Sequence, residues 1–190
     1  MASVTLLDYG MGNLRSVTRA LEAAGLVVER SVQPGDGAIV LPGVGAFPEA
    51  ARRLRESEAW EGVAGAMEVG RPVLGICLGM QLLFEESDEF ETTAGFGWLR
   101  GRVESLAARQ GSGVTVPNMG WHRLTGLGDP FVYLAHSFGV ASSPDAVATL
   151  DHGGTWVAAA RRDNVFGVQF HPEKSGPAGI TLLRDWVATR

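Results

Sequence analysis

The single cysteine of the 190-residue chain, Cys77, stands between two glycines in a pattern that suits a nucleophile. Residues 71–74 before it, with a short apolar run after Pro72, predict a buried strand, and residues 82–86 after it predict a helix. Gly75 and Gly79 lie two positions to either side, as in the G-x-S-x-G turn with Cys in place of Ser. Such a turn holds the side chain at the top of a sheet, and the free N–H groups of the helix start favour a thiolate. A free cysteine is more often a buried core residue, so the catalytic interpretation requires a base elsewhere.

His171 and Glu173 are the candidate base and its orienting carboxylate. The apolar residues 165–170 predict a strand that ends at His171, which would bring the ring to the sheet edge where Cys77 is expected. Residues two apart in an extended chain face the same way, and Pro172 stiffens the backbone between the pair. Cys77, His171 and Glu173 would then serve as nucleophile, base and orienting group. Most single histidines are structural, and it is the His-Pro-Glu sequence at a strand end that favours catalysis here.

Acyl transfer also requires hydrogen-bond donors for an oxyanion. In enzymes with this turn one donor is the N–H after the nucleophile, here that of Leu78. The second comes from a strand-to-helix loop, for which Gly43, Val44 and Gly45 are the candidates. Glycines on both sides of Val44 leave its peptide free to approach an anion or to turn over. The segment is also a helix-initiation turn after Pro42, and that interpretation does not exclude the role.

The other histidines and an early glycine pair are weaker candidates. His136 follows a predicted strand and could line a pocket, His122 is weaker, and the neighbours of His152 are typical of a surface turn. One cysteine and scattered histidines give no metal-ligand spacing, so we expect no metal and no cofactor. Gly10 and Gly12 begin like the dinucleotide fingerprint G-x-G-x-x-G, but its third glycine is absent, which favours a tight turn.

Composition and charge argue against several classes of protein. Hydrophobic residues make up 45% and charged residues 19% of the chain, which suits a single globular domain over residues 1–190. The net charge of −5 and the lack of a basic run argue against a nucleic-acid partner. No apolar run approaches the roughly 20 residues of a membrane span, and no basic segment precedes the first apolar run, so we expect neither a membrane partner nor a signal peptide. A lone thiol suits a reducing compartment, which predicts a cytoplasmic protein.

Strands and helices alternate in the first half of the chain. Strands are expected at residues 4–7, 26–28, 38–41 and 71–74, a first helix at residues 14–24, and one further helix carrying the apolar residues from Ala50 to Met67. This alternation predicts an α/β protein, in which a parallel sheet has helices on both faces. Ligands of such sheets bind at the carboxyl ends of the strands, where Cys77 and the 42–47 loop would both lie.

The second half of the chain has a different pattern, beginning after Glu91. Helical periodicity is absent, and short β-like runs occur at residues 102–106, 114–116, 121–124, 132–134, 147–150, 156–160 and 165–170. We expect these runs to add antiparallel strands to one edge of the parallel sheet within the same domain. Residues 178–190 carry a single apolar stripe and predict a closing helix.

Several of these segments resemble one known family. Residues 75–81 together with His171-Pro172-Glu173 resemble the signature of the class I (triad) glutamine amidotransferases, which implies a flavodoxin-like fold with a mostly parallel, mixed sheet. Residues 8–14, 42–47, 75–87 and 169–175 further resemble the glutaminase subunits of imidazole glycerol phosphate synthase, from histidine biosynthesis. These segments span nearly the whole chain.

The resemblance implies a mechanism and a partner. Cys77 would attack the side-chain amide of L-glutamine, ammonia would leave with a proton from His171, and water would hydrolyse the thioester to glutamate. The ammonia would pass through a channel to a (β/α)₈-barrel cyclase subunit, which forms imidazole glycerol phosphate and aminoimidazole carboxamide ribotide in a heterodimer. The implied glutamine contacts are Gly43, Gly45, Gln81, Glu89, Ser137 and Phe138, and the implied partner-facing residues are Asn13, Asn118, Trp121 and Lys174.

Three departures from the family pattern concern the pocket rim and the interface. The family usually has Pro-His-Met-Gly-Trp-Asn where residues 117–122 read Pro-Asn-Met-Gly-Trp-His. Phe138 replaces a common Tyr, and residues 96–99 are bulkier than the usual Leu-Gly-Leu. None of these changes affects Cys77, His171 or Glu173.

Other interpretations stay open. A glutaminase subunit of pyridoxal phosphate synthase would carry a Gly-Gly-Glu-Ser loop, and an anthranilate synthase type a Pro-Gly-Pro-Gly loop, whereas residues 42–47 read Pro-Gly-Val-Gly-Ala-Phe. A triad hydrolase that acts alone, such as a γ-glutamyl peptidase, would hydrolyse glutamyl substrates vigorously without a partner. A non-catalytic interaction module would leave Cys77 unreactive towards a glutamine-analogue electrophile.

Overall fold

A seven-stranded sheet forms the centre of the protein, in a computed structural model that describes residues 2–109 and 114–188. The strand order is β11-β12-β13-β4-β3-β1-β2. Five neighbouring strands, β13 to β2 in that order, pair in parallel, while β12 and β11 continue the sheet antiparallel. The strands are β1 (Ser3–Leu7), β2 (Val27–Ser31), β3 (Ala38–Leu41), β4 (Val73–Ile76), β11 (Ala146–Asp151), β12 (Thr155–Arg162) and β13 (Val165–Val168). Every residue of β3, β4 and β13 is buried, because these strands are covered on both faces.

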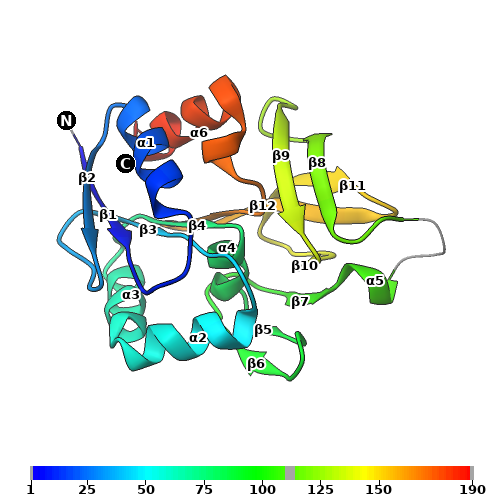
Figure 1. Cartoon of the computed structure of the whole chain (residues 1–190), viewed down its shortest axis with the longest axis horizontal. Coiled ribbons are helices and arrows are strands. Elements are labelled where there is room, and N and C mark those ends of the chain that lie inside the picture. Colours follow the sequence, from blue (N-terminus) through cyan, green and yellow to red (C-terminus); the bar gives the residue numbers. More distant parts are fainter. Residues whose placement is uncertain (1, 110–113, 189–190) are drawn as a thin grey trace.

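Helices cover both faces of this sheet, as Figure 1 shows. On one face lie α1 (Leu14–Ala23) and α6 (Gly176–Ala188), and on the other lie α2 (Phe47–Glu56), α3 (Ala59–Glu68) and α4 (Leu78–Leu83). Each face has its own buried apolar cluster, with Leu14 and Leu183 in the first and Phe47 and Val63 in the second. The predicted α/β class, with a mostly parallel, mixed sheet flanked by helices, is therefore confirmed.

Two smaller sheets complete the molecule. A four-stranded sheet has the order β10-β7-β5-β6, and an antiparallel pair is formed by β8 and β9. In Figure 1 the β8–β9 pair stands at the end of the molecule opposite to β2. The bounds are β5 (Glu86–Ser87), β6 (Thr93–Ala94), β7 (Arg102–Ser105), β8 (Asn118–Arg123), β9 (Phe131–His136) and β10 (Phe138–Val140), with a short helix α5 (Leu106–Arg109) after β7.

Several predictions about elements are wrong. The single helix expected from Ala50 to Met67 is divided into α2 and α3, because Glu58 adopts a left-handed conformation with φ 60° and turns the chain between them. The β-like runs of the second half do not all join one sheet edge. Only β11 and β12 do so, whereas β13 pairs in parallel with β4 inside the sheet.

The remaining runs of the second half form the smaller sheets. Burial alternates along β8 and β9, which shows that only one face of this pair is covered, so it packs as a separate layer instead of extending the main sheet. Residues 114–116 are not a strand, and α5 is a short helix in a half where none was expected. The closing helix is present and begins at Gly176, two residues earlier than predicted, while the last two residues of the prediction, 189–190, lie outside the described residues.

Candidate active site

Cys77 lies where the chain turns from β4 into α4. Its backbone has φ 54° and ψ −111°, which an L-residue rarely adopts, and its N–H donates to the carbonyl of Val168 in β13. A conformation of this kind persists only where the surrounding structure imposes it, and such residues cluster at functional sites. Cys77 is 6% exposed and lines a pocket. The predicted strand-to-helix turn at the cysteine is thus confirmed, but the helix predicted over residues 82–86 instead spans Leu78–Leu83, and Glu86 begins β5.

Three glycines allow the backbones around Cys77 to touch. A Cβ on Gly79 would lie 1.9 Å from the carbonyl oxygen of Leu41, and a Cβ on Gly75 would lie 2.6 Å from the carbonyl oxygen of Gly79. A Cβ on Gly43 would come within 2.8 Å of the Gly79 nitrogen. Each contact involves backbone that cannot rotate away, so only glycine fits at these positions.

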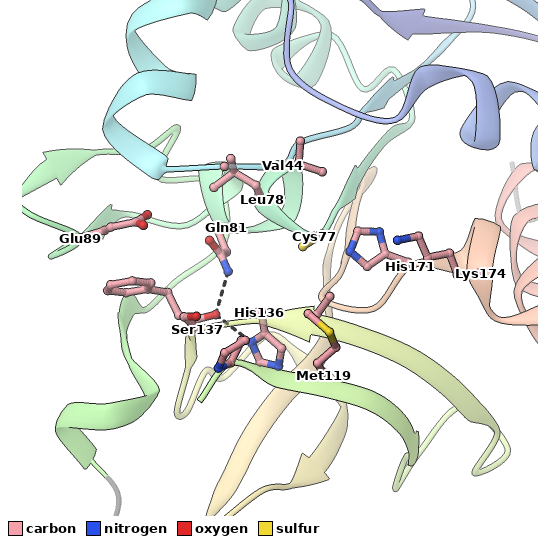
Figure 2. A pocket seen from close by; sticks show the side chains of 14 residues that line it. Val44, Cys77, Leu78, Gln81, Glu89, Met119, His136, Ser137, His171 and Lys174 are labelled. Carbon is pink, nitrogen blue, oxygen red and sulfur yellow. Dashed lines mark hydrogen bonds between the residues drawn. The ribbon is translucent and has the colours of Figure 1, made fainter. Parts of the chain in front are cut away.

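His171 is fixed beside Cys77 by bonds to its backbone and to its ring. Its N–H donates to the carbonyl of Tyr133 in β9 at 2.9 Å, and its carbonyl accepts from the hydroxyl of Ser175 at 2.7 Å. Ring Nδ1 and Oε1 of Glu173 are 2.8 Å apart, and both side chains are buried. In Figure 2 the thiol and the ring point towards each other.

The pairing of His171 with Glu173 has a different cause from the one expected. The sequence predicts it for an extended chain, but Pro172–Lys174 forms one turn of 3₁₀ helix, η1. This turn brings the carboxylate back to the ring. One oxygen of Glu173 accepts from Nδ1, and the other has no hydrogen-bond partner within the described part of the chain.

The charge state of the His171 ring follows from its neighbours. Burial alone would lower its pKa, but the hydrogen bonds and charges of Cys77 and Glu173 raise the pKa of His171 to about 10. The ring therefore carries a proton at neutral pH. Since Nδ1 is bound to Glu173, Nε2 is the nitrogen that can share a proton with the sulfur.

A pocket of about 350 Å³ opens over Cys77. Figure 2 shows it between α4 with the loop after β3 on one side and the strands β8 to β10 on the other. The structure brings most of the predicted residues to its wall, namely Val44, Gly45, Cys77, Leu78, Gln81, Glu89, Ser137, Phe138, His171 and Lys174.

Two predicted oxyanion donors approach this pocket from different elements. Val44 is 43% exposed in the loop between β3 and α2, and the Tyr9 hydroxyl fixes the start of that loop by donating to the Pro42 carbonyl at 2.6 Å. Leu78 is the first residue of α4, where a backbone N–H has no partner within the helix. The pocket thus has two backbone segments that can face a developing negative charge.

Glu89 contributes a carboxylate to the far side of the pocket, as Figure 2 shows. Its Oε2 accepts a 2.7 Å hydrogen bond from the N–H of Phe47 at the start of α2. Burial raises the pKa of Glu89, and the hydrogen bond from Phe47 offsets part of this effect. A cationic group of a ligand beside Glu89 would compensate the cost of burying this charge.

Five predicted site residues do not line the pocket. Glu173 lies behind the ring of His171, and Gly43 is buried against α4. Asn13 and Trp121 are exposed, as the expected partner-facing residues should be. The expectation for Asn118 is wrong, because its side chain is 1% exposed and hydrogen-bonds the ring of its cross-strand neighbour His136 at 3.1 Å.

Sequence reasoning missed one polar neighbour of the nucleophile and underrated another residue. Nε2 of Gln169 is 3.6 Å from the sulfur of Cys77, although Gln169 was assigned only to a strand. His136, a weak candidate, is buried and lines the pocket. The available signal for Gln169 was one polar residue in the apolar run of residues 165–170, two positions before His171.

Within residues 2–109 and 114–188, no group of three or more His, Cys, Asp or Glu side chains could hold a metal ion. None of the helices in these described ranges combines the length and the apolar character needed to cross a membrane.

Comparisons with known proteins agree over nearly the whole chain. Residues 5–189 match the family model described as glutamine amidotransferase class-I. The imidazole glycerol phosphate synthase subunit HisH of Symbiobacterium thermophilum is 42% identical over 98% of this chain and 93% of its own. The protein of the same name from Thermosynechococcus vestitus is 44% identical over 98% of this chain and 96% of its own.

Solved structures show the same fold at lower identity. One described as a glutamine amidotransferase has a TM-score of 0.78 and 21% identity, and covers 97% of this chain and 98% of its own. The structure of PurLQS from Thermotoga maritima has a TM-score of 0.72 and 21% identity, and covers 100% of this chain and 99% of that chain. At such identities the likeness concerns the fold alone.

Proposed function

Because this chain belongs to the class I glutamine amidotransferases, and within them to the family of HisH subunits of imidazole glycerol phosphate synthase, we propose that it hydrolyses glutamine at Cys77 and supplies ammonia to a cyclase subunit. One observation carries the chemistry. The strained Cys77 at the β4–α4 turn lies in a pocket with His171, whose ring is hydrogen-bonded to Glu173 at 2.8 Å. This is the arrangement of nucleophile, base and orienting group that acyl transfer requires.

The reaction proceeds through a thioester. The sulfur of Cys77 adds to the side-chain amide carbon of glutamine, and the charge that moves to the amide oxygen is received by the N–H groups of Leu78 and Val44. Nε2 of His171 gives its proton to the amide nitrogen, the carbon–nitrogen bond breaks and ammonia leaves. His171 then takes a proton from water, which attacks the thioester and releases glutamate and the thiol.

The pocket has groups suited to the rest of the substrate. Glu89 binds the α-ammonium group of glutamine, which compensates the cost of burying its carboxylate. Gln81 and the backbone of Gly45, Ser137 and Phe138 hold the other polar groups of the amino acid. The support for these roles is that all five residues line the pocket around Cys77.

A (β/α)₈-barrel cyclase subunit is the proposed partner, in a heterodimer that forms imidazole glycerol phosphate and aminoimidazole carboxamide ribotide. The β8–β9 pair, which contributes Met119 to the pocket wall, exposes three large apolar side chains, Met119 (63%), Trp121 (57%) and Phe131 (60%). Lys174 adds a charge at the same pocket. A partner that covers these groups would also shield the pocket from water, so that less of the released ammonia would be lost. The cytoplasm is the compartment we propose, because the reaction depends on a free thiol.

The proposed function is tested by measuring synthesis from glutamine and synthesis from ammonia separately. In the complex with the cyclase subunit, we expect Cys77→Ala to lower glutamine-dependent synthesis by about 10³-fold or more, because no thioester can form. Synthesis from added ammonium salt should stay at the wild-type rate, since the cyclase site is untouched. Equal loss of both activities would contradict the supply of ammonia, and retention of both would contradict the role of Cys77.

A further inference from the structure

The sulfur of Cys77 has a buried amide beside it as well as the imidazole of His171. Gln169 follows β13, is 1% exposed, and its Nε2 lies 3.6 Å from Sγ. The Oε1 of Gln169 accepts a hydrogen bond from Nε2 of Gln81 at 3.0 Å. Gln81 is itself 4% exposed. The two side-chain amides therefore form a buried series of hydrogen bonds that begins at the sulfur of Cys77.

A backbone carbonyl determines which end of each amide donates in this series of hydrogen bonds. Nε2 of Gln81 also donates to the carbonyl oxygen of Phe138 at 2.9 Å, and a carbonyl can only accept. The end of the Gln81 side chain between Phe138 and Gln169 must therefore be its NH₂ group. Its second hydrogen reaches Gln169, so the atom of Gln169 that meets it must be the oxygen. The opposite end of the Gln169 amide is then an NH₂ group, and it faces the sulfur.

His136 holds the same carbonyl from the other side, as the dashed lines in Figure 2 show. Nδ1 of its ring is 2.8 Å from the Phe138 oxygen and must be the protonated nitrogen. Burial lowers the pKa of His136 to about 4, so the ring is neutral and its Nε2 accepts from the side-chain amide of Asn118 at 3.1 Å. The carbonyl of Phe138 belongs to β10, which pairs with β7, so backbone pairing fixes the segment that carries this acceptor.

We propose that Gln169 is a positioning residue for the glutaminase reaction, whose amide N–H holds the Cys77 sulfur and favours its thiolate form. The proposal rests on the function proposed above. A donor to sulfur stabilises a negative charge there, whereas the amide oxygen in the same position would oppose it. The series of hydrogen bonds through Gln81 and Phe138 ensures that the donor and not the oxygen faces Cys77.

Neither Tyr9 nor His171 provides the Cys77 sulfur with a hydrogen-bond donor that stays in place during the whole reaction. The charge of Cys77 raises the pKa of His171 and of Tyr9. Burial and that charge raise the pKa of Tyr9, so its hydroxyl stays neutral, and it already donates to Pro42. His171 supplies a proton that it must give away during the reaction. Gln169 supplies a donor that remains in place throughout.

The test uses Gln169→Met, which keeps an unbranched side chain of similar length and removes the donor. Alkylation of Cys77 by iodoacetamide is measured against pH, because this small reagent reacts with the thiolate and makes no use of the glutamine contacts of Gln81. We expect the midpoint of the alkylation profile to move upward by about one pH unit, a tenfold slower reaction on its acid side. Gln33→Met, which makes the same change at an exposed position, should leave the midpoint unchanged.

A second variant and a second reagent separate the possible failures. Gln169→Leu removes the donor with a different shape and should show the same upward shift, while thermal unfolding monitors the fold of both variants. An unchanged midpoint in either folded variant would overturn the role of Gln169. Reaction of the wild-type chain with 6-diazo-5-oxo-L-norleucine, a glutamine analogue, reports separately on the function itself. If that reagent modified Cys77 while the midpoints stayed equal, only the present proposal would fail.

Discussion

At the scale of single residues, the chemistry at Cys77 depends on which neighbouring groups donate protons and which accept them. His171 and Glu173 could be predicted from sequence, because a histidine followed two residues later by a carboxylate is a local pattern. The orientation of Gln169 could not be predicted in that way. It depends on Gln81 and Phe138, which lie 88 and 31 positions away in the chain and meet Gln169 only through the fold.

Asn118 shows the same limit at the pocket rim. The family resemblance placed Asn118 towards the partner, yet its side chain is buried. Its burial depends on His136, the residue opposite it on β9, which provides an acceptor that sequence alone does not pair with it.

The raised pKa of His171 predicts how stability depends on pH. Because the folded ring holds its proton up to a pKa of about 10, its contribution to stability is complete below the ordinary value of 6.5 and is lost as pH rises through about 10. We expect the difference in free energy of unfolding between the wild type and His171→Asn to shrink from pH 8.5 to 10.5. This window is chosen because an ordinary thiol, of pKa about 8.5, is at least half deprotonated throughout it in the unfolded chain. Urea denaturation at several pH values in this window measures that difference.

His122→Asn is the matched control for this measurement. Burial and the nearby His152 lower the pKa of His122, so its ring is neutral throughout the window and contributes no change with pH. The stability difference between His122→Asn and the wild type should therefore stay constant. A constant difference for His171→Asn as well would show that the ring does not hold its proton in the folded protein.

At the scale of elements, the site depends on how closely α4 approaches β3 and β4. The sequence predicted the turn and the reason for its glycines, because a turn of this kind is local. It did not predict the break between α2 and α3, since the apolar periodicity continues past Glu58 and only its left-handed backbone shows the break. The η1 turn was missed for a similar reason, because His-Pro-Glu is compatible with extended and turned backbone alike.

Two glycine substitutions test the importance of this close approach. We expect Gly79→Ala to lower the free energy of unfolding by about 3 kcal/mol or more, because its Cβ would lie 1.9 Å from the carbonyl oxygen of Leu41. Gly65→Ala is the control, since Gly65 lies inside α3 and a Cβ there would meet nothing within 4 Å. Alanine is the better helix former, so Gly65→Ala should raise the free energy of unfolding by about 0.5–1 kcal/mol.

Urea denaturation of both variants measures the two changes, and they should have opposite signs. If Gly79→Ala were as stable as the wild type, the backbone contact between α4 and β3 would have to be looser than the structure shows.

At the scale of the whole molecule, the site results from the order of the parallel strands. β4, which ends one residue before Cys77, is flanked by β3 and β13, and Leu41 and Val168 pair with Gly75 and Ile76 of β4. The 42–47 loop follows β3 and His171 follows β13, so the two reach Cys77 from opposite sides. The sequence predicted that these segments share a sheet edge, but not that they flank β4, because strand order depends on non-local pairing. The same reason explains why the runs at β7, β8 and β9 were assigned to the wrong sheet.

The apolar surface of β8 and β9 predicts how glutaminase activity depends on binding of the cyclase subunit. We expect the isolated chain to have low glutaminase activity, and the activity to rise to a plateau as the cyclase subunit is added in the presence of its nucleotide ligand. Trp121→Glu should raise the half-saturating concentration of the cyclase subunit by about tenfold or more, because a buried interfacial tryptophan contributes strongly to binding and an unpaired carboxylate in its place opposes it. The plateau should not change, since Trp121 does not line the pocket around Cys77.

Val69→Glu is the matched control for this titration. Val69 is 75% exposed and caps α3, which Figure 1 shows at the other end of the molecule from β8 and β9. Both substitutions add one negative charge at an exposed apolar residue, so a general effect of charge would shift both titrations alike. A shift for Trp121→Glu alone would locate the docking surface on the β8–β9 pair. Full activity of the isolated chain would contradict dependence on a partner. Equal half-saturating concentrations of the cyclase subunit for both variants would show that the interface does not lie on the β8–β9 pair.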